Sequence, residues 1–527
     1  MDPHEVRAIR GSLSRATFAK LLGVTSLTVL RWELAEGTKE ARRPRAKMVE
    51  ELRKLADAGG GQAPAPPVDS VSPNDDDDDD ASEPALPSQP PPNRVPIGAE
   101  LDALQRDQGL LLPLLEKLGY ESWPQAEDAL LDLLSSRALT SHAGRCLATL
   151  GLVQAQFFGR LDTRTALATL LPILSDAEQG KLEASVAARA HVLAVLLFGG
   201  PDSRCFDLGR VNVHAERAEQ LLTAEDSELR CLLAAGRVIS TRFMGPQAVM
   251  VAFRANQSSL DGGPSLLSRL IAESLRGLFA MLSGDQESAL RHTEAGVAIA
   301  ERMRLFGLLV AMLADRAGRM LRGTWTPSQV LELTRQAREL AERHQLAPSE
   351  PLIRVFGHEC EALARMALFD QALALGAEAE ALARRGGVVL SPLAAPLVRT
   401  CAFTHRTAEL TALAEAFEHD TPAGRGPLNV HALLARSATA GVAGEYGAEA
   451  ELLEQICSAP DTTPGLDYVL HDAHIQLTVD HVLMRDQARA QAALRRAEQF
   501  YEQRPSVWHA AQLRRIHGFA LLAAGRL

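Results

Sequence analysis

The sequence predicts an all-α protein that consists of a small N-terminal domain and a large body of paired helices. Apolar residues recur every three or four positions over most of the 527 residues, as in Leu101, Leu104 and Leu111, which is the period of an amphipathic helix. Ala and Leu dominate, whereas the Val- and Ile-rich alternation typical of strands does not occur. A chain of this length exceeds one compact domain, so we expect at least two folding units.

Charge divides the chain into three segments, although the formal net charge of the whole is −11. Residues 1–57 hold 12 Lys and Arg against 8 Asp and Glu, residues 58–97 hold 1 against 8, and residues 98–527 hold 42 against 50. A basic head on an acidic chain is typical of a protein whose head contacts nucleic acid. These three segments are the predicted head, linker and body.

Residues 58–97 are predicted to be a disordered linker. They contain ten prolines, a glycine run at 59–61 and a six-aspartate tract at 75–80, with few large apolar residues. Proline stiffens such a chain, like charges extend it, and too little apolar surface is available to offset the entropy of folding. We expect a solvated spacer that lets head and body move independently. The alternative is that the aspartate tract folds back over the basic head as a phosphate mimic.

In the head, residues 13–33 fit a helix, a tight turn and a second helix, flanked by helices over residues 5–11 and 44–56. Gly23 supplies the left-handed turn, Thr25 is a good N-cap for the second helix, and Ala19 is small where the two helices cross. The residues predicted to face inward are Phe18, Leu22, Val24, Val29 and Trp32, together with Met48, Val49, Leu52 and Leu55 of the last helix. The pattern predicts a helix-turn-helix domain.

This stretch resembles the Cro and phage-repressor (XRE) class of helix-turn-helix domains, through its Leu-Ser, Phe-Ala, Leu-Gly-Val-Thr, Thr-Val and Trp-Glu pairs. The resemblance implies that the second helix enters the major groove of double-stranded DNA. It assigns base contacts to Ser26, Leu27, Leu30 and Arg31, and backbone contacts to Arg15, Thr25, Lys39, Arg42 and Arg43. Arg31 is the best candidate to read a base, since a guanidinium pairs bidentately with guanine.

The head departs from that class in two ways. Members commonly have Gln at the start of both motif helices, where this sequence has Arg15 and Ser26-Leu27. Leu27 and Leu30 are large and apolar on a face that should be exposed without DNA. They fit contacts with thymine methyl groups, and they equally fit a protein-binding surface on a head that no longer binds DNA.

One head of net charge +4 contacts about half of a DNA site and neutralises few phosphates. Specific DNA binding should therefore require two heads, so we predict a homodimer that is assembled through the body. The linker would let two tethered heads adapt to different half-site spacings.

The body shows a loose period of about 40 residues. Helix breakers stand at residues 245, 284, 323, 369, 406, 446 and 486, at intervals of 39, 39, 46, 37, 40 and 40. A unit of that length is a helix hairpin that cannot bury its apolar face alone, so neighbours must stack into a solenoid. Residues 284–300 and 369–381 resemble the second halves of tetratricopeptide repeats, which implies an α-solenoid that binds a peptide or a protein. A large irregular helical bundle is the competing interpretation.

The body carries no recognisable catalytic motif. Nucleotide-binding, zincin and nucleophile-elbow patterns are missing, and His358-Glu359-Cys360 begins like a zincin but lacks the second histidine. We therefore predict no enzyme activity and no cofactor. The densest polar cluster is His471, Asp472, His474, Asp480 and His481. Its spacing suits metal ligands on one helix face, but it is more typical of a solvated or capping set.

Arginines scattered through the body fit either a concave groove for an acidic peptide or an ordinary half-exposed surface, and the second is more typical. They are Arg145, Arg230, Arg237, Arg242, Arg316 and Arg319. The six cysteines lie far apart without a CxxC pair, which argues against a disulfide framework or a zinc ribbon. No apolar run approaches the roughly 20 residues that cross a bilayer, and no signal peptide precedes the head, so we expect a cytoplasmic protein.

Together these patterns predict a sequence-specific DNA-binding transcriptional regulator. Its helical-repeat body would bind a peptide or protein effector, mediate dimerisation, or do both. In outline it is similar to helix-turn-helix regulators with tetratricopeptide repeats that respond to signalling peptides. The alternative is a non-enzymatic scaffold or adaptor whose repeats bind proteins and whose head no longer binds DNA.

Overall fold

The computed structural model describes residues 6, 29, 32, 49, 99–120, 123–136, 138–200, 205–323, 326–419, 429–459, 466–502 and 507–523. The chain divides into two compact units, Met1–Pro87 and Ser88–Leu527. In the first unit, Val6, Val29 and Trp32 are helical and buried, and Val49 is helical and half-buried. The inward positions predicted for Val29 and Trp32 are therefore confirmed. The predicted linker lies outside the described residues.

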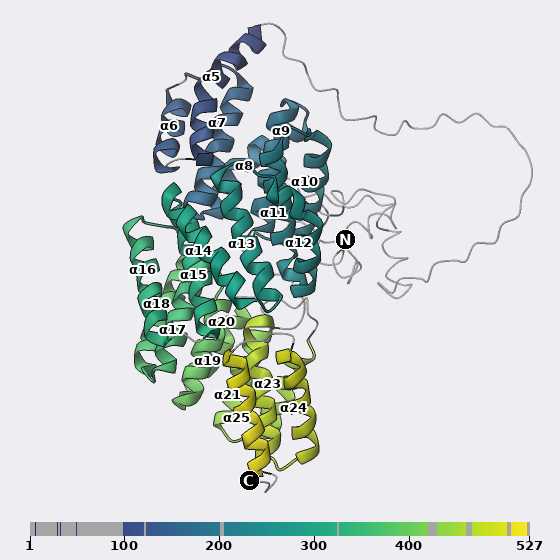
Figure 1. Ribbon diagram of the computed structural model, residues 1–527, viewed down its shortest axis with the longest axis vertical. Helices are drawn as coiled ribbons and strands as arrows, with labels where there is room; N and C mark the ends of the chain where they lie inside the picture. Colours follow the sequence, from purple (N-terminus) through teal and green to yellow (C-terminus); the bar gives the residue numbers. More distant parts are fainter. Residues whose placement is uncertain are drawn as a thin grey trace, which may run out of the picture. The chain divides into compact units, whose positions relative to one another are not determined.

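The second unit is all-α, as predicted, and its described residues contain no strand (Figure 1). Its first helices are α5 (Ala99–Tyr120), α6 (Trp123–Ser135), α7 (His142–Gln154), η1 (Ala155–Gly159), α8 (Thr163–Glu178), α9 (Ala184–Gly199), α10 (Leu208–Leu221), α11 (Ser227–Ser240), η2 (Thr241–Met244), α12 (Pro246–Asp261), α13 (Leu266–Leu282) and α14 (Gln286–Met303). They continue as α15 (Phe306–Arg322), α16 (Pro327–Arg343), α17 (Glu350–Arg365), α18 (Phe369–Gly386), η3 (Ser391–Leu393), α19 (Ala394–Phe403), α20 (Thr407–His419), α21 (Val430–Val442), α22 (Tyr446–Cys457), α23 (Leu466–Leu483), α24 (Gln487–Glu502) and α25 (Val507–Ala523).

The period of about 40 residues is confirmed. The even-numbered helices α12 to α24 begin at residues 246, 286, 327, 369, 407, 446 and 487, at intervals of 38 to 42. Each begins at or just after one of the predicted breakers. The body is therefore a stack of helix hairpins and not an irregular bundle.

The turn inside most hairpins has the same backbone geometry. A residue with left-handed φ follows the odd-numbered helix at Gly284 (81°), Ala367 (59°), His405 (54°), Gly444 (79°) and Arg485 (60°). The next residue donates its N–H to the carbonyl five positions back, as Asp285 does to Ala280 at 2.9 Å and Leu368 to Leu363 at 3.0 Å. This is the Schellman termination that satisfies the last carbonyls of a helix. Glycine occupies the strained position in only two of these five turns.

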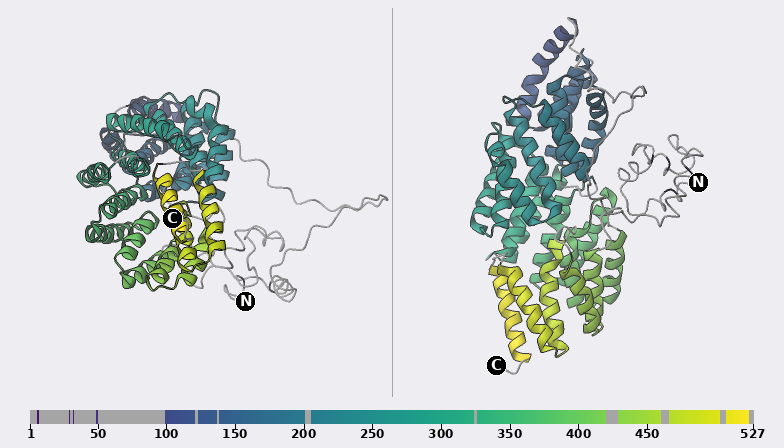
Figure 2. Two further views of the ribbon diagram at one scale, coloured as in Figure 1. Left: turned by 60° about the horizontal axis from the view of Figure 1, so that its bottom comes forward. Right: turned by 90° about the vertical axis from the view of Figure 1, so that its right-hand side faces the viewer.

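The hairpins form two layers. From α15 to α25 each odd-numbered helix contacts the next odd-numbered one, and the same holds from α5 to α13. The even-numbered helices from α10 onward pack on the two odd-numbered helices that flank them. In a curved stack the helices that touch one another lie on the inside of the curve, so the odd-numbered helices are the inner layer. Figure 2 (left) shows the helices of the body following one another around that curve.

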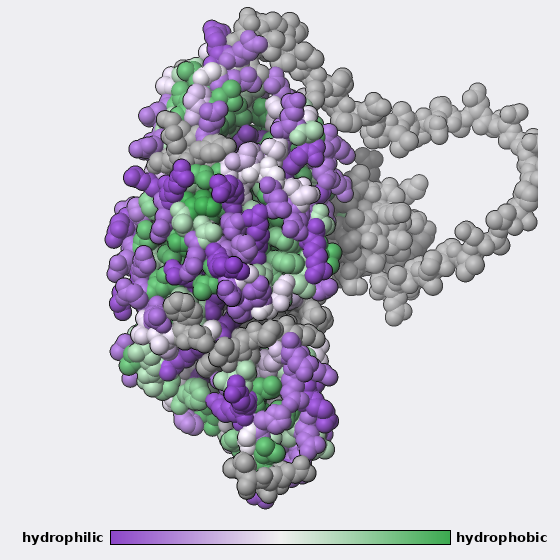
Figure 3. Space-filling view, viewed as in Figure 1, coloured by the Kyte–Doolittle hydropathy of each residue, from purple (hydrophilic) through white to green (hydrophobic). Residues whose placement is uncertain are grey.

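A continuous apolar core runs between the two layers from α5 to α24, and a smaller cluster joins α23, α24 and α25. Helix α9 is the most enclosed element, because every residue from Val186 to Gly199 except Arg189 is buried. Gly236 of α11 permits this packing, since a Cβ there would lie 2.6 Å from Cγ1 of Val195. On the face shown in Figure 3, hydrophilic residues predominate and hydrophobic residues show between them in small groups. No helix among the described residues is both long and apolar enough to cross a bilayer.

Curvature brings distant segments together. Helix α5 contacts α13, η1 contacts α15, and α25 contacts α15. Between residues 161–164 and 347–351 lies a cavity of about 90 Å³, beside which Nη2 of Arg164 donates to the carbonyl of Gly387 at 2.5 Å. That volume is well below the roughly 300 Å³ at which ligand pockets for small molecules begin. The cavity lies where two parts of the superhelix meet.

Candidate functional site

The residues predicted to contact DNA lie outside the described residues. They are Arg15, Thr25, Ser26, Leu27, Leu30, Arg31, Lys39, Arg42 and Arg43. Their assignment therefore stays a prediction. The polar clusters described below all belong to the body.

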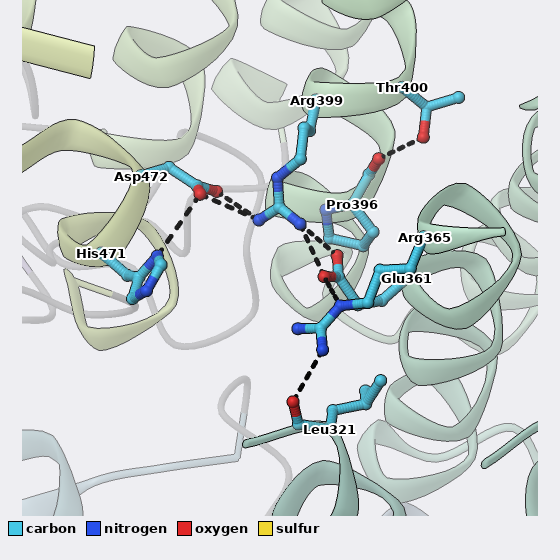
Figure 4. A network of polar contacts seen from close by, with 8 residues as sticks. All are labelled: Leu321, Glu361, Arg365, Pro396, Arg399, Thr400, His471 and Asp472. Atoms are coloured by element: carbon cyan, nitrogen blue, oxygen red, sulfur yellow. Dashed lines mark hydrogen bonds and ion pairs between the residues drawn. The ribbon is translucent and has the colours of Figure 1, made fainter. Parts of the chain in front are cut away.

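The most connected polar group of the body centres on Arg399, and we call it the Arg399 network (Figure 4). Its members are Glu361 and Arg365 of α17, Arg399 of α19, and His471 and Asp472 of α23. All three helices belong to the inner layer. Nη1 of Arg399 donates to both oxygens of Glu361 at 2.5 and 2.6 Å, and Nη2 donates to both oxygens of Asp472 at 2.7 and 2.9 Å. One guanidinium thus joins two carboxylates from helices that lie on either side of it.

Four further contacts extend the Arg399 network. Arg365 donates from Nε to Glu361 at 2.7 Å and from Nη1 to the carbonyl of Leu321, the penultimate residue of α15, at 2.7 Å. On the opposite side, Nδ1 of His471 lies 3.5 Å from Asp472. The hydroxyl of Tyr501 in α24 donates to the His471 carbonyl at 3.2 Å. The network therefore links α15, α17, α19, α23 and α24.

The three central groups of the network are ionised despite their burial. Burial raises the pKa of Glu361, but Arg399 and Arg365 outweigh it and hold the pKa below its usual range. Burial likewise raises the pKa of Asp472, and Arg399 and His471 bring it below its ordinary value. Burial lowers the pKa of Arg399, whereas Asp472 and Glu361 raise it by more. The side chains of Glu361, Asp472 and Arg399 remain 11%, 23% and 27% exposed, so the network still reaches solvent.

The polar face of α17 continues toward its N-terminus. Arg354 donates to Asp315 of α15 at 2.9 Å. His358 follows one turn later, where burial, together with the nearby Arg354 and Arg322, lowers its pKa to about 3. Gly318 of α15 makes room for the imidazole, because a Cβ there would lie 2.9 Å from Nε2 of His358. Arg354, His358, Glu361 and Arg365 thus lie three or four residues apart on one face of an inner helix.

The arginines that the sequence suggested for a groove have partners within the body. Arg145 and Arg230 donate to carbonyls of the loops before their helices, and Arg319 donates to the carbonyl of Ala289 at 2.6 Å. Arg237 pairs with Glu219, Arg316 with Glu294, and Arg242 with both Glu350 and the carbonyl of Gly200. Arg319 is buried, so the expectation of a half-exposed surface arginine is wrong at that position.

The histidine cluster of α23 differs from the solvated set that its spacing suggested. His474, Asp480 and His481 are buried, and their surroundings differ. The His474 ring packs on Phe500. Asp480 accepts from Nε2 of Gln476 at 3.0 Å and lies beside Glu449 of α22. Burial raises the pKa of both carboxyls, and the closeness of Asp480 raises that of Glu449 further, so this pair holds at least one proton at neutral pH. The expectation of solvated side chains overlooked the packing of α23 between α22 and α24.

A different set of side chains brings metal-binding atoms together. Among the described residues, His142 and Cys146 of α7 and Asp176 of α8 place one donor atom each within 4.8 Å of one another. Their spacing in the sequence does not mark them as a group, because Asp176 belongs to the next helix of the hairpin. Cys146, Cys231, Cys360 and Cys401 are buried thiols, as expected for small apolar side chains.

Comparison with known proteins finds similarity in fold. No protein-family profile matches the chain. No curated protein sequence matches it either. The structure is similar to that of a Rap protein complexed with competence and sporulation factor, at 11% identity and a TM-score of 0.42, over 73% of this chain and 99% of that one. It is also similar to the apo form of RapI, at 9% identity and a TM-score of 0.41, over 70% of this chain and 99% of that one.

Proposed function

We propose that this chain is a cytoplasmic, homodimeric transcriptional regulator that binds double-stranded DNA through its head and a peptide or protein effector along the inner layer of its body. The effector would bind one conformation of the body more tightly than another. Because the body positions the two heads, this difference in affinity would change how the heads are placed on DNA. The proposal includes no catalytic step and no cofactor.

The DNA-binding part rests on the helix-turn-helix pattern of residues 13–33 and on the positive charge of the head. The burial of Val29 and Trp32 supports it, since both fall on the predicted inner side of the recognition helix. Arg31, between them in sequence, is two residues from Val29 and one from Trp32, and a helix places it on a different face. That position suits a side chain that reaches a base edge.

The effector-binding part rests on one observation, which is the concentration of charge in the inner layer of α15 to α23. Burying ionised groups costs several kcal/mol each before their mutual attraction offsets it, and apolar side chains of similar size often stabilise a fold at least as well. The Arg399 network is thus not explained by stability alone. Its carboxylates and guanidinium groups alternate along partly open inner helices, where they can exchange partners with the backbone and charged side chains of a bound peptide.

DNA binding can be tested with the full chain and a selected duplex. Repeated selection from random double-stranded DNA would supply the probe, and its affinity would be measured between about 50 and 200 mM salt. Arg15, Lys39, Arg42 and Arg43 give eight basic backbone contacts per dimer, which predicts a loss of roughly 10³–10⁵-fold across that range. Arg31→Ala should weaken the selected site by about 1–3 kcal/mol per head and relax its specificity.

A matched control separates base reading from loss of charge. Arg53→Ala removes the same charge from the last helix of the head, where no DNA contact is predicted, and should retain the sequence preference. If no sequence is enriched and salt has no effect, DNA binding is wrong. The adaptor alternative, in which Leu27 and Leu30 dock on protein, would then stand.

Effector binding can be tested with a phage-displayed library of random peptides. Peptides selected on the full chain should lose binding to Asp472→Asn, which keeps the shape of the side chain and removes its charge from the Arg399 network. Glu454→Gln is the matched control, because Glu454 and Arg496 form a bidentate pair at 2.5 and 2.7 Å between the outer helices α22 and α24. A selected peptide should also change the affinity for DNA, and the DNA should change the affinity for the peptide by the same factor. Equal loss in both variants would contradict an inner-layer site.

A further inference from the structure

The hairpin of α7 and α8 carries three side chains whose arrangement matches metal coordination. His142 and Cys146 lie four residues apart near the start of α7, so a helix places them on one face. Asp176 comes from the last turn of α8, the partner helix. Nε2 of His142 lies 3.1 Å from Oδ2 of Asp176 and 3.7 Å from Sγ of Cys146.

These separations agree with tetrahedral coordination. Bonds of about 2.0 Å to nitrogen or oxygen and about 2.3 Å to sulfur, at tetrahedral angles, separate the donor atoms by about 3.3–3.6 Å. The two printed distances fall within a few tenths of an ångström of that range, and all three donor atoms lie within 4.8 Å of one another. Small side-chain rotations are enough to close such a site.

Neighbouring residues hold the Asp176 carboxylate in place and leave the three side chains open to solvent on one side. Nζ of Lys181 lies 3.2 Å from Oδ1 of Asp176, which leaves Oδ2 directed toward His142. A second partner of this kind orients a metal ligand. His142 is 52% exposed whereas Cys146 is buried, so the group is open to solvent on the imidazole side.

We propose that His142, Cys146 and Asp176 form a three-ligand site for a divalent transition metal of the zinc class, with water in the fourth position. Thiolate, imidazole and carboxylate together favour zinc over magnesium or calcium, which prefer all-oxygen sites. The site lies apart from the proposed effector surface and does not depend on it.

Binding requires one proton to leave. A cysteine binds a metal as its thiolate, whereas an ordinary thiol carries a proton at neutral pH. On binding, the S–H bond breaks, the sulfur lone pair forms the bond to the metal, and the proton passes to solvent. Bond formation to the metal must offset this cost, and affinity should rise as pH rises.

The sequence offers an internal control for the test. Arg145-Cys146 recurs as Arg230-Cys231 at the matching place of α11, 85 residues later, and Ser227 stands where α7 has His142. Cys231 is buried like Cys146, and its Sγ lies 3.6 Å from the Leu260 carbonyl. Replacing Cys231 therefore removes an equivalent thiol from a place that has no imidazole.

The experiment is a titration of the full chain with Co²⁺, which substitutes for Zn²⁺ and absorbs in the near ultraviolet when a thiolate binds it. We expect one equivalent of Co²⁺ to develop that band, Zn²⁺ to abolish it, and Zn²⁺ to raise Tm. Cys146→Ala should lose both effects and Cys231→Ala should retain them. Asp176→Asn, which keeps the thiol in place, should weaken binding by at least about tenfold.

Three results would overturn the site. They are no thiolate band at a large excess of Co²⁺, a band that persists in Cys146→Ala, and a band lost equally in Cys231→Ala. Circular dichroism of each metal-free variant establishes whether it is folded. If Cys146→Ala is unfolded, the Asp176→Asn titration decides alone, and unchanged affinity in that variant would then refute the site.

Discussion

Helices α9 and α17 both belong to the inner layer, yet their sequences differ in kind. Residues 190–199 of α9 are all buried, and its one buried histidine pairs with another histidine. Helix α17 carries Arg354, His358, Glu361 and Arg365 along one face. The same repeat architecture thus tolerates an inner helix, α9, in which Arg189 is the one residue of the Asp, Glu, Lys and Arg types. The charges of α17 are therefore not a requirement of the repeat architecture, which is why we propose that they serve effector binding.

The largest effect expected is the loss of the guanidinium at the centre of the Arg399 network. Arg399→Met leaves Glu361 and Asp472 buried without their common partner, which should lower the free energy of unfolding by about 3–5 kcal/mol. Denaturant unfolding of the full chain would measure it. Arg496→Met, in the outer pair with Glu454, should cost about 1 kcal/mol or less because both groups are well exposed. An equal loss of unfolding free energy in Arg399→Met and Arg496→Met would contradict the expected difference between the inner network and the outer pair.

On the apolar side of the comparison, His191 of α9 should make the body sensitive to acid. Nδ1 of His191 lies 3.1 Å from Nδ1 of His214, so one ring donates and the other accepts. Burial, together with the neighbouring His214, lowers the pKa of His191 to about 4. Because the folded pKa lies below the ordinary 6.5, stability is fully present above pH 6.5 and falls as the pH drops from 6.5 toward 4.

The size of this acid effect follows from the pKa. The loss should be about 3 kcal/mol over that window, at about 1.4 kcal/mol per pH unit. The measurement is the free energy of unfolding against pH, compared with His191→Phe, which cannot bind the proton. The variant should have the shallower slope between pH 6.5 and 4. Parallel slopes would show that His191 titrates normally in the folded chain.

A smaller effect is expected where α15 meets α17. Gly318→Ala places a Cβ against the His358 imidazole, which must shift, and we expect a loss of about 1–3 kcal/mol. Gly109→Ala is the control, because no atom lies within 4 Å of a Cβ built at that helical position. That variant should be neutral or stabilising, by up to about 1 kcal/mol. A harmless Gly318→Ala would mean that the polar face of α17 is loosely packed.

The hairpin turns provide the smallest effect. Ala367 holds a left-handed φ of 59°, which costs a residue with a Cβ roughly 1–2 kcal/mol. Ala367→Gly should therefore stabilise the body by about 0.5–1 kcal/mol. Gly444→Ala makes the reverse change at the matching turn, where a Cβ meets no atom within 4 Å, so its expected cost of about 1 kcal/mol reports backbone strain alone. Thermal unfolding of both variants would reveal opposite shifts.

Local patterns were enough to predict the hairpins of the body. Breakers such as Gly245, Gly284 and Phe369 mark turns because glycine or a helix-start residue leaves a direct signal in sequence. The strained turns at His405 and Arg485 leave weaker signals, since tertiary packing imposes a left-handed conformation on residues that do not favour it. The solvated state expected of His474 and His481 was wrong because burial depends on neighbouring helices.

The Arg399 network was not predicted, because its members are far apart in sequence. Glu361 and Arg399 are 38 residues apart, close to one repeat period, and Asp472 is a further 73 residues away. A signal for the first contact does exist. Opposite charges one period apart also pair in Asp315–Arg354, at 39 residues, and Glu454–Arg496, at 42. A search for such pairs at the repeat spacing would have found these contacts.

The most direct test of the central claim is a map of the DNA that the protein occupies in its own cells. Immunoprecipitation of the full chain, of Arg31→Ala and of a chain without residues 1–57 would be compared at matched protein levels. We expect discrete sites that share a repeated or two-fold sequence, weakened by Arg31→Ala and absent without the head. Maps that are identical for all three proteins, or without discrete sites, would contradict it.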